Sequence, residues 1–491
     1  MCGSELLFDS TTQLKGWETR LRRALCPISI IVHSLTKAPI RLVLGLLAVT
    51  WVLPCAFGDV GVTTLFSFNQ ANGAQPAAGL IQGSDGAFYG TTEVGGSQNN
   101  GTVFRITPAG AFTNVLSFTG TGGAYPGANP AASLVWGTNG NLYGTTSAGG
   151  TNDYGAIFQM TAGGAFTSLV SFTGTNGPVL GNYPNGLVQS GDGNLYGTTQ
   201  MGGTNDILAG GDGTIFRVTP AGALTTLFCF NSTNGANPYA GLVQGTNGNF
   251  YGTTQAGGSN GVGTLFEVTT NGVLTSLVSF NTTNGANPQA GLVQGGDGNF
   301  YGTAYFGGST NAGTVFRLTP TGGFTTLVSF NNTNGANPYA SLVQGADGNF
   351  YGTTELGGTN NNGTAFAISP TGVLTTLASF AGTTNNSYPV AGLVTGADGY
   401  LYGTTAFGGV NYQGTIFRFP PPPNFLSRKQ TGGVLTFTWS AAVGQTYEVQ
   451  FKTNLNQAIW IDLFTNTATG STATNSDTIG PDRQRFYRIR L

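Results

Sequence analysis

Most of the chain alternates short runs of β-branched, aromatic and aliphatic residues with segments rich in Gly, Asn and Thr. Between residues 77 and 118 four such runs follow one another, with the sequences AGLIQG, AFYGTT, GTVFRIT and FTNVLSF. Runs of this composition, bounded by turn residues, are typical of β-strands. Asp–Gly or Asn–Gly joins the first two runs and supplies the positive φ of a tight hairpin. The pattern predicts a four-stranded antiparallel unit.

This unit recurs along the chain, and its clearest marker is the sequence YGTT or a close variant. The tyrosines of the seven markers lie 50 to 55 residues apart, at Tyr89, Tyr143, Tyr196, Tyr251, Tyr301, Tyr351 and Tyr402. Four strands in a period of about 50 residues are typical of a β-propeller blade. We therefore expect an all-β fold, a seven-bladed β-propeller over residues 59–419, with an open solenoid or β-helix as the alternative.

The two ends of the repeat series are out of phase. The series begins with TTLFSF at 63–68, which has no unit before it, and ends with GTIFRF at 414–419, which has no fourth strand after it. If the N-terminal strand joins the last blade as its outermost strand, every sheet edge of the ring is paired or short. We expect this strand to close the propeller.

Candidate binding residues are those that differ between repeats, because the scaffold does not dictate them. Tight turns are expected on one face and long loops on the other. The candidate binding positions are therefore the ends of strands next to the long loops. The position just after the second strand holds Glu93, Ser147, Gln200, Gln255, Tyr305, Glu355 and Ala406. The start of the first strand holds Tyr239, Gln289 and Tyr339. Aromatic faces and amides around a channel mouth suit a sugar or a peptide, and solvated loop ends are the alternative.

Residues that recur in every unit are interpreted as structural. The YGTT tyrosines and the GTxF phenylalanines are expected to pack between sheets. The turn position before Gly alternates between Asp and Asn, so the turn is required there and the carboxylate is not.

Carboxylates give two further candidates. Asp153, Asp206 and Asp212 lie in neighbouring long loops and form a weak candidate Ca²⁺ site, with ordinary Asp–Gly turn chemistry as the alternative. Glu93 and Glu355 are the pair to check for glycoside hydrolysis, but they belong to the first and sixth units. We expect that separation to keep them apart.

The first 58 residues differ from the rest. Basic residues precede the apolar run LVLGLLAVTWVLPCAFG at 42–58, which predicts a signal peptide cleaved before Asp59, with an uncleaved N-terminal membrane segment as the alternative. Cleavage would remove His33, the single histidine, and every cysteine except Cys229. The mature chain would then lack the imidazole of a Ser–His–Asp triad or a His–Cys metal site. We expect no enzyme activity, no cofactor, and a buried thiol at Cys229 in place of the serine of TTLxSF.

The low charge of the chain limits the kinds of partner that we expect it to bind. Only 7% of the residues are charged and the formal net charge is −2, with basic residues scattered singly. This distribution favours neither nucleic acid nor an anionic membrane, so membrane contact is expected only through residues 1–58 if they are retained. A monomer is expected.

The pattern NxYGTTxxGG…GTxFxxTPxGxxTTLxSF resembles the Gloeo/Verruco (GloVer) tandem repeat of secreted bacterial proteins. The resemblance covers about residues 62–419 and implies a secreted or cell-envelope bacterial protein, without assigned binding residues. After the polyproline spacer at 420–423, residues 424–491 resemble the small fibronectin-III-like β-sandwich tails of such proteins, with Trp439, Tyr447, Trp460 and Tyr487 expected in the core.

Together these features favour a non-catalytic extracellular binding or scaffold protein that recognises a glycan or a protein through the loop-rich propeller face. A polysaccharide hydrolase or lyase and a purely structural surface protein are the alternatives.

Overall fold

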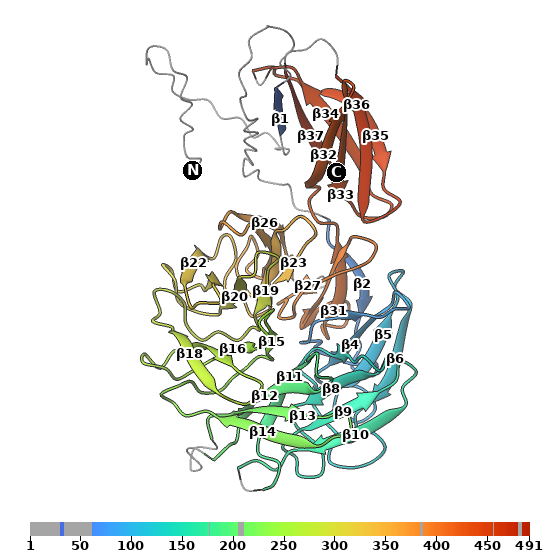
Figure 1. Cartoon of the computed structure of the whole chain (residues 1–491). Coiled ribbons are helices and arrows are strands. Elements are labelled where there is room, and N and C mark those ends of the chain that lie inside the picture. Colours follow the sequence, from blue (N-terminus) through green and yellow to red (C-terminus); the bar gives the residue numbers. More distant parts are fainter. Residues whose placement is uncertain are drawn as a thin grey trace.

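The computed structural model describes residues 30–33, 61–175, 177–204, 211–382, 386–454, 456–479 and 484–491. Every regular element in these ranges is a β-strand (Figure 1). A search of the same ranges finds no helix with the length and apolarity needed to span a bilayer. The predicted export segment, residues 1–58, lies outside the described residues apart from β1 (Ile30–His33).

Within residues 61–419 the strands form seven four-stranded antiparallel sheets and a small two-stranded one. Each of the first six sheets comes from one sequence repeat. The first is β3 (Ile81–Gln82), β4 (Phe88–Thr92), β5 (Thr102–Ile106) and β6 (Phe112–Ser117). The second is β7 (Val135–Trp136), β8 (Leu142–Thr146), β9 (Ala156–Met160) and β10 (Phe166–Ser171). The third is β11 (Asn182–Gln189), β12 (Leu195–Met201), β13 (Thr214–Val218) and β14 (Leu224–Cys229).

The next three sheets repeat this order. The fourth is β15 (Val243–Gln244), β16 (Phe250–Thr254), β17 (Thr264–Val268) and β18 (Leu274–Ser279). The fifth is β19 (Val293–Gln294), β20 (Phe300–Ala304), β21 (Thr314–Leu318) and β22 (Phe324–Ser329). The sixth is β23 (Val343–Gln344), β24 (Phe350–Thr354), β25 (Thr364–Ile368) and β26 (Leu374–Ser379). The two-stranded sheet pairs β27 (Asn386–Ser387) with β30 (Phe407–Gly408).

The seventh sheet combines the two ends of the repeat series. It contains β28 (Val394–Thr395), β29 (Leu401–Thr405) and β31 (Thr415–Phe419), and its outer strand is β2 (Thr63–Ser67). β2 pairs antiparallel with β31, with Thr63 opposite Arg418 and Ser67 opposite Thr415. The pairing of the N-terminal strand with the last repeat is therefore present, as the phase of the repeats predicted.

Neighbouring sheets are joined by one repeated hydrogen bond. The first Thr of each YGTT-type segment donates to a carbonyl at the start of the next sheet, as Thr91 does to Pro130 at 3.2 Å. Thr404 of the seventh sheet makes the same bond to Pro76, before the first sheet, at 2.9 Å. Thr404 and Pro76 are more than 300 residues apart in sequence, yet they form the bond that joins consecutive sheets. The last sheet therefore contacts the first as any two consecutive sheets do.

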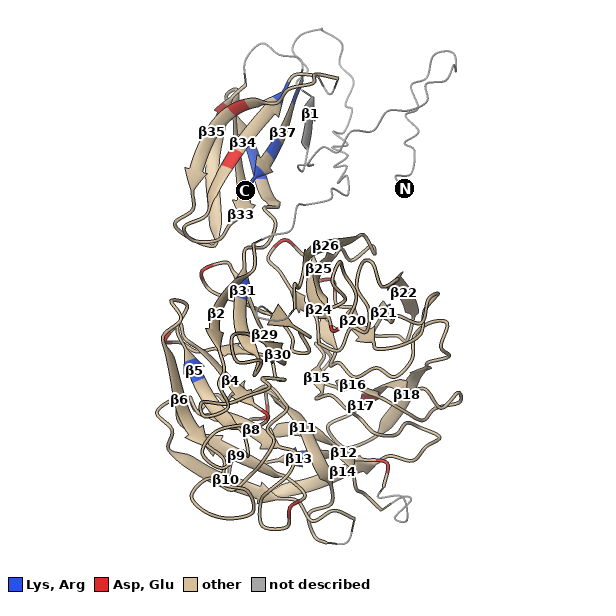
Figure 2. Ribbon diagram, turned by 180° about the vertical axis from the view of Figure 1, so that it is seen from behind, with Lys and Arg blue, Asp and Glu red and all other residues tan. Residues whose placement is uncertain are grey.

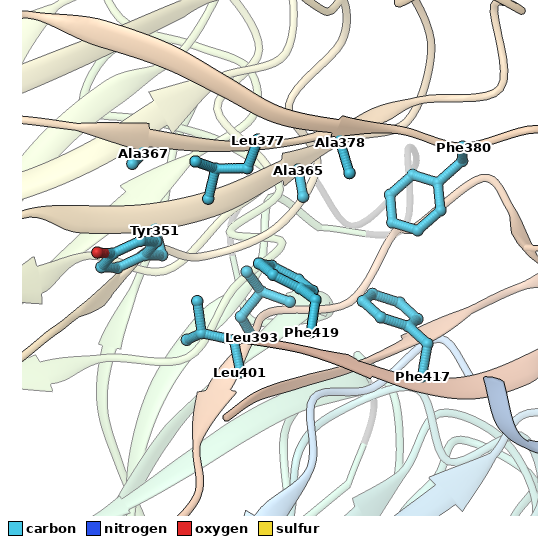
Figure 3. Packing of buried hydrophobic residues seen from close by; sticks show 10 residues of the cluster. All are labelled: Tyr351, Ala365, Ala367, Leu377, Ala378, Phe380, Leu393, Leu401, Phe417 and Phe419. Atoms are coloured by element: carbon cyan, nitrogen blue, oxygen red, sulfur yellow. The ribbon is translucent and has the colours of Figure 1, made fainter. Parts of the chain in front are cut away.

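Aromatic packing between sheets follows the same rule. Figure 3 shows the cluster between the sixth and seventh sheets, in which the Phe380 and Phe417 rings lie 5.1 Å apart. Phe68 and Phe104 repeat that contact between the seventh and first sheets at 5.3 Å. All seven marker tyrosines are at most 2% exposed. The structural interpretation of the repeated aromatics agrees with this burial.

The first strand of each unit is shorter than the sequence indicated. AGLIQG predicts six residues, but β3 pairs over two, and only β11 is long. The reason is crowding at the strand start: a Cβ on Gly79 would lie 2.9 Å from Ser133 Oγ and 3.4 Å from Gly392 O. Residues of the second and seventh sheets thus approach the first sheet there. The start of the first strand is held by the Thr hydrogen bonds rather than by backbone pairing with the second strand.

Residues 424–491 form two sheets around a separate core. One contains β32 (Phe425–Thr431), β33 (Val434–Ser440) and β36 (Thr472–Thr478), and the other β34 (Thr446–Lys452), β35 (Ile461–Thr467), β37 (Gln484–Arg490) and β1. Trp439, Tyr447 and Tyr487 are buried in that core as expected. Trp460 is not in this core: it is partly exposed, and the Lys452 and Arg488 cations lie 4.8 and 4.5 Å from its ring.

This C-terminal module (residues 424–491) contacts the turn side of the sixth and seventh sheets (Figure 1). Gln445 Nε2 donates to the Tyr400 hydroxyl at 2.8 Å, and the Val443 amide donates to the Asp398 carbonyl at 2.9 Å. Asn424 Nδ2 donates to the Asp347 carboxylate. The module therefore lies against the face opposite the long loops.

Candidate ligand-binding cavity

A cavity of about 560 Å³ lies where the starts of the seven first strands meet. Every one of the seven sheets contributes to its lining, from Ala77 in the first to Gly392 in the seventh. About half of the lining residues are Ala, Gly or Ser, and several of the larger ones are Leu or Val. The polar and aromatic side chains therefore decide what the cavity can bind.

The backbone that carries these side chains is fixed by a repeated asparagine. Asn129, Asn237, Asn287 and Asn337 precede a proline and have φ between 50° and 55°, in the left-handed region that Asn tolerates. Each side-chain amide donates to a backbone carbonyl of the preceding sheet, as Asn237 does to Gln200 at 3.2 Å. The residue after the proline is thereby held at the cavity. At this position stand Tyr239, Gln289 and Tyr339.

Three tyrosines form a contiguous aromatic group on one side of the cavity. Tyr239 and Tyr339 both line it and meet edge to face, with ring centroids 6.0 Å apart. Tyr305 packs behind them at 6.0 Å from Tyr339, and its hydroxyl donates to Glu355 Oε2 at 2.7 Å. Burial, followed by contact with Tyr239 and the charges of Glu355 and Glu93, raises the pKa of Tyr339. Its hydroxyl therefore stays protonated at neutral pH and can donate a hydrogen bond.

Glu93 is the acidic residue of the cavity lining. Burial raises the pKa of Glu93 above its ordinary value. Among the described residues, no hydrogen bond or ion pair to its carboxyl is present, and no Lys or Arg lines the cavity. Glu355, the other carboxylate of the pair considered for glycoside hydrolysis, does not line the cavity and accepts the Tyr305 hydroxyl.

The structure groups the sequence-derived candidates in two sets. Those that line the cavity are Tyr239, Gln289, Tyr339, Glu93 and Gln200. Tyr305 and Glu355 lie behind Tyr339, and Gln255 contributes its carbonyl, which accepts from Asn287 at 3.0 Å. These three residues support the lining and are not part of it.

Tyr183 was not selected from the sequence but lines the cavity. It is 41% exposed and has a φ of 54°, in a position that Asn fills in four other repeats. Gln75 and Tyr388 hold the same position with the same φ of 54° but do not line the cavity, so the repeat pattern alone does not single out Tyr183.

The weak Ca²⁺ candidate gains nothing from the described residues. Asp153 Oδ1 accepts the Gly149 amide at 2.8 Å, the bond that Asn99 makes to Gly95 in the first unit. Asp212 Oδ2 accepts the Ser232 hydroxyl at 3.1 Å, and Asp206 lies outside the described residues. No group of three potential ligands occurs in the part of the chain that the structure describes.

Cys229 is half-buried at the end of β14. It pairs with Thr214 on β13, and a Cβ on Gly203 would lie 3.3 Å from its sulfur. Serine holds this position in the other units, as Ser117 does opposite Thr102. The thiol thus occupies the serine site that the repeat predicts, although it is less buried than expected.

The sheets and the cavity define an all-β, propeller-like repeat protein with a central cavity. The chain belongs to the Gloeobacter/Verrucomicrobia repeat family, which matches residues 55–244, 130–344 and 245–454. No curated protein matches the sequence.

Solved structures share the fold at low identity. The BP39L lectin from Burkholderia pseudomallei is 11% identical, with 79% of this chain and 99% of the lectin covered and a TM-score of 0.51. A gluconolactonase from Xanthomonas campestris is 13% identical over 74% of this chain and 91% of its own, at a TM-score of 0.40. A puromycin hydrolase is 13% identical over 76% and 60%, at 0.43. The lectin shows the fold alone, and the other two likenesses are too weak to bear on this chain.

Proposed function

We propose that the protein is a non-catalytic glycan-binding protein of the bacterial cell surface or surroundings, with its binding site in the central cavity. The observation that carries the proposal is the cavity lining. Side chains that differ between repeats, Tyr239, Tyr339 and Gln289, meet there, while the repeated side chains pack inside the sheets. Aromatic faces next to amides suit the apolar faces and hydroxyls of sugars.

The size of the cavity favours a glycan over a protein partner. Pockets of about 300 to 1,000 Å³ hold small ligands, and this one is about 560 Å³. A stable protein interface buries about 800 Å² on each partner, which a recess of this size does not offer.

The proposal includes an architecture. Residues 59–419 form a seven-bladed propeller that β2 closes, 420–423 form a spacer and 424–491 a small β-sandwich-like domain. The bonds of Thr404 to Pro76 and of Ala397 to Gln82 support closure, because they repeat the contacts of consecutive sheets. Residues 1–58 direct export, supported by basic residues ahead of an apolar run. The exported chain acts as a monomer.

The test is a glycan array probed with purified residues 59–491, with the double variant Tyr239→Ala/Tyr339→Ala, and with Tyr412→Ala as control. Tyr412 is 58% exposed and does not line the cavity. We expect selective binding that the double variant weakens at least tenfold, about 1.4 kcal/mol, and that the control retains. Binding lost equally in the control, or none at all, contradicts the proposal; cleavage of a bound oligosaccharide would favour the hydrolase or lyase alternative.

A further inference from the structure

Within residues 59–419 the basic residues share one position of the repeat, whereas the acidic residues lie on both faces. This part holds twelve Asp and Glu, four Arg and no Lys. All four arginines stand at one repeat position, on the third strand: Arg105, Arg217, Arg317 and Arg418. Arg105 and Arg418 form ion pairs with Asp85 and Asp398 of the tight turns, at 2.7 and 3.8 Å. Arg105 and Arg418 are therefore paired on the turn face, and the Lys and Arg residues that the structure describes outside 59–419 lie on β32, β34 and β37 of the C-terminal module (Figure 2).

The cavity has the opposite character. Glu93 lines it, Glu355 lies behind the tyrosines, and no basic side chain reaches it among the described residues. Glu93 is half-buried, and the partial loss of hydration without a charged partner raises its pKa. In the ionised state its carboxylate can bind a positively charged group of a ligand.

The tyrosines of the cavity suit the same ligand. A cation is attracted to the face of an aromatic ring within about 6 Å and to a carboxylate by a charge-assisted hydrogen bond. Tyr239 and Tyr339 offer rings, and both line the same cavity as Glu93. An ammonium group at this place would satisfy Glu93 and keep its sugar ring against the tyrosines.

We propose that the glycan bound in the central cavity carries a free amine, as in an amino sugar without its N-acetyl group, and that Glu93 binds the ammonium. This inference rests on the proposed function. Tyr239, Tyr339 and Gln289 contact the sugar, and Glu93 selects its charge. N-acetylation removes the positive charge and adds bulk, so it weakens binding.

The experiment is calorimetric titration of residues 59–491 with paired oligomers of glucosamine, galactosamine and mannosamine, each as the free amine and as the N-acetyl form. At least one free-amine oligomer is expected to bind tenfold or more tightly than its N-acetyl partner. Glu93→Gln is expected to abolish that preference while retaining the melting temperature, because it keeps the shape and removes a desolvated charge. Glu448→Gln, an exposed carboxylate of the C-terminal module, is the control and keeps the preference.

The outcomes separate this inference from the proposed function. Equal or tighter binding of the N-acetyl forms that still depends on Tyr239 and Tyr339 overturns the amine and leaves the glycan site. Equal binding of hexalysine overturns the saccharide and points to a cationic peptide. No pair with a free-amine preference, together with an array blank for every glycan, overturns both.

Discussion

At the scale of single residues, the repeat is held by a tyrosine and a turn. The Tyr89 hydroxyl donates to Asp85 Oδ2 at 3.1 Å, while Asp85 Oδ1 accepts the Ala87 amide of the turn. In the second unit Asn139 bonds the Tyr143 hydroxyl at 2.8 Å and so replaces the carboxylate. The sequence predicted that the turn is required and the carboxylate is not. Asp85 and Asn139 both form a hydrogen bond with the tyrosine hydroxyl of their unit, which agrees with that prediction.

The residue on the third strand that faces this turn changes with the charge of the turn residue. Burial opposes ionisation of Asp85, but its bonds to Arg105, Ala87 and Tyr89 outweigh that effect and lower its pKa. In the fourth unit the turn residue is Asn247, and Glu267 replaces the arginine, accepting from Asn247 at 3.1 Å and from the Tyr251 hydroxyl at 2.8 Å. This exchange was visible in the aligned repeats, but only the fold shows that the two positions touch.

A glycine inside the second strand leaves room for side chains of the two neighbouring strands of its own sheet, which gives a test at this scale. A Cβ on Gly197 would lie 2.7 Å from Phe216 Cζ and 3.0 Å from Leu187 Cδ2. Gly197→Ala is expected to lower the free energy of unfolding by about 1 to 3 kcal/mol through overpacking, measured by urea denaturation. Gly191→Ala in the same repeat, where nothing lies within 4 Å, is the control and should lose nothing. Equal effects of the two substitutions would contradict this packing argument.

At the scale of elements, β2 decides whether the last sheet is complete. Its strand covers the edge of β31, and Phe68 beyond it is fully buried against Phe104. The first strands, in contrast, contribute little ladder, because two-residue pairings carry few backbone bonds. Side-chain hydrogen bonds from Thr and Asn of the preceding sheet and of the strand starts hold these first strands in place instead.

Removing β2 should therefore open the last sheet. A chain of residues 69–491 is expected to lose at least about 3 kcal/mol relative to residues 59–491, the magnitude for loss of one buried Phe, and to aggregate through the exposed edge. Thermal melting with size-exclusion chromatography measures both. A synthetic peptide of residues 59–70 should restore the melting temperature by strand addition, and a scrambled peptide should not. Unchanged stability of the shortened chain would show that β2 does not close the sheet.

At the scale of the whole molecule, two departures from the repeat mark where the C-terminal module sits. Tyr400 replaces the Asn that follows the turn in five other units, and it meets Gln445 and Val443 of the module. Ala367 replaces the third-strand arginine, and Asn424 binds the Asp347 carboxylate in its place. The module occupies positions that the repeat normally fills with its own side chains.

Restoring the repeat residue should release the module. Ala367→Arg places a guanidinium next to Asp347, where it competes with Asn424, and is expected to weaken docking by roughly 1 to 3 kcal/mol. Differential scanning calorimetry should then resolve a separate transition for the module, and proteolysis at the spacer 420–423 should accelerate. Gln159→Arg, the same change in the second unit far from the module, should do neither. A single unchanged transition in Ala367→Arg would contradict the competition.

The sequence alone determined the strands, their order and the pairing of the N-terminal strand with the last repeat, because these follow from local turn chemistry and from the count of repeated segments. It also indicated Tyr239, Gln289 and Tyr339, because variation among repeats separates free positions from structural ones. Only the tertiary structure placed Tyr183 in the cavity, put Glu93 and Tyr339 in the lining of the same cavity and located the module. Those facts depend on which repeats face one another across the centre and on where a cation is missing, and no local pattern encodes a distance between residues more than 100 positions apart.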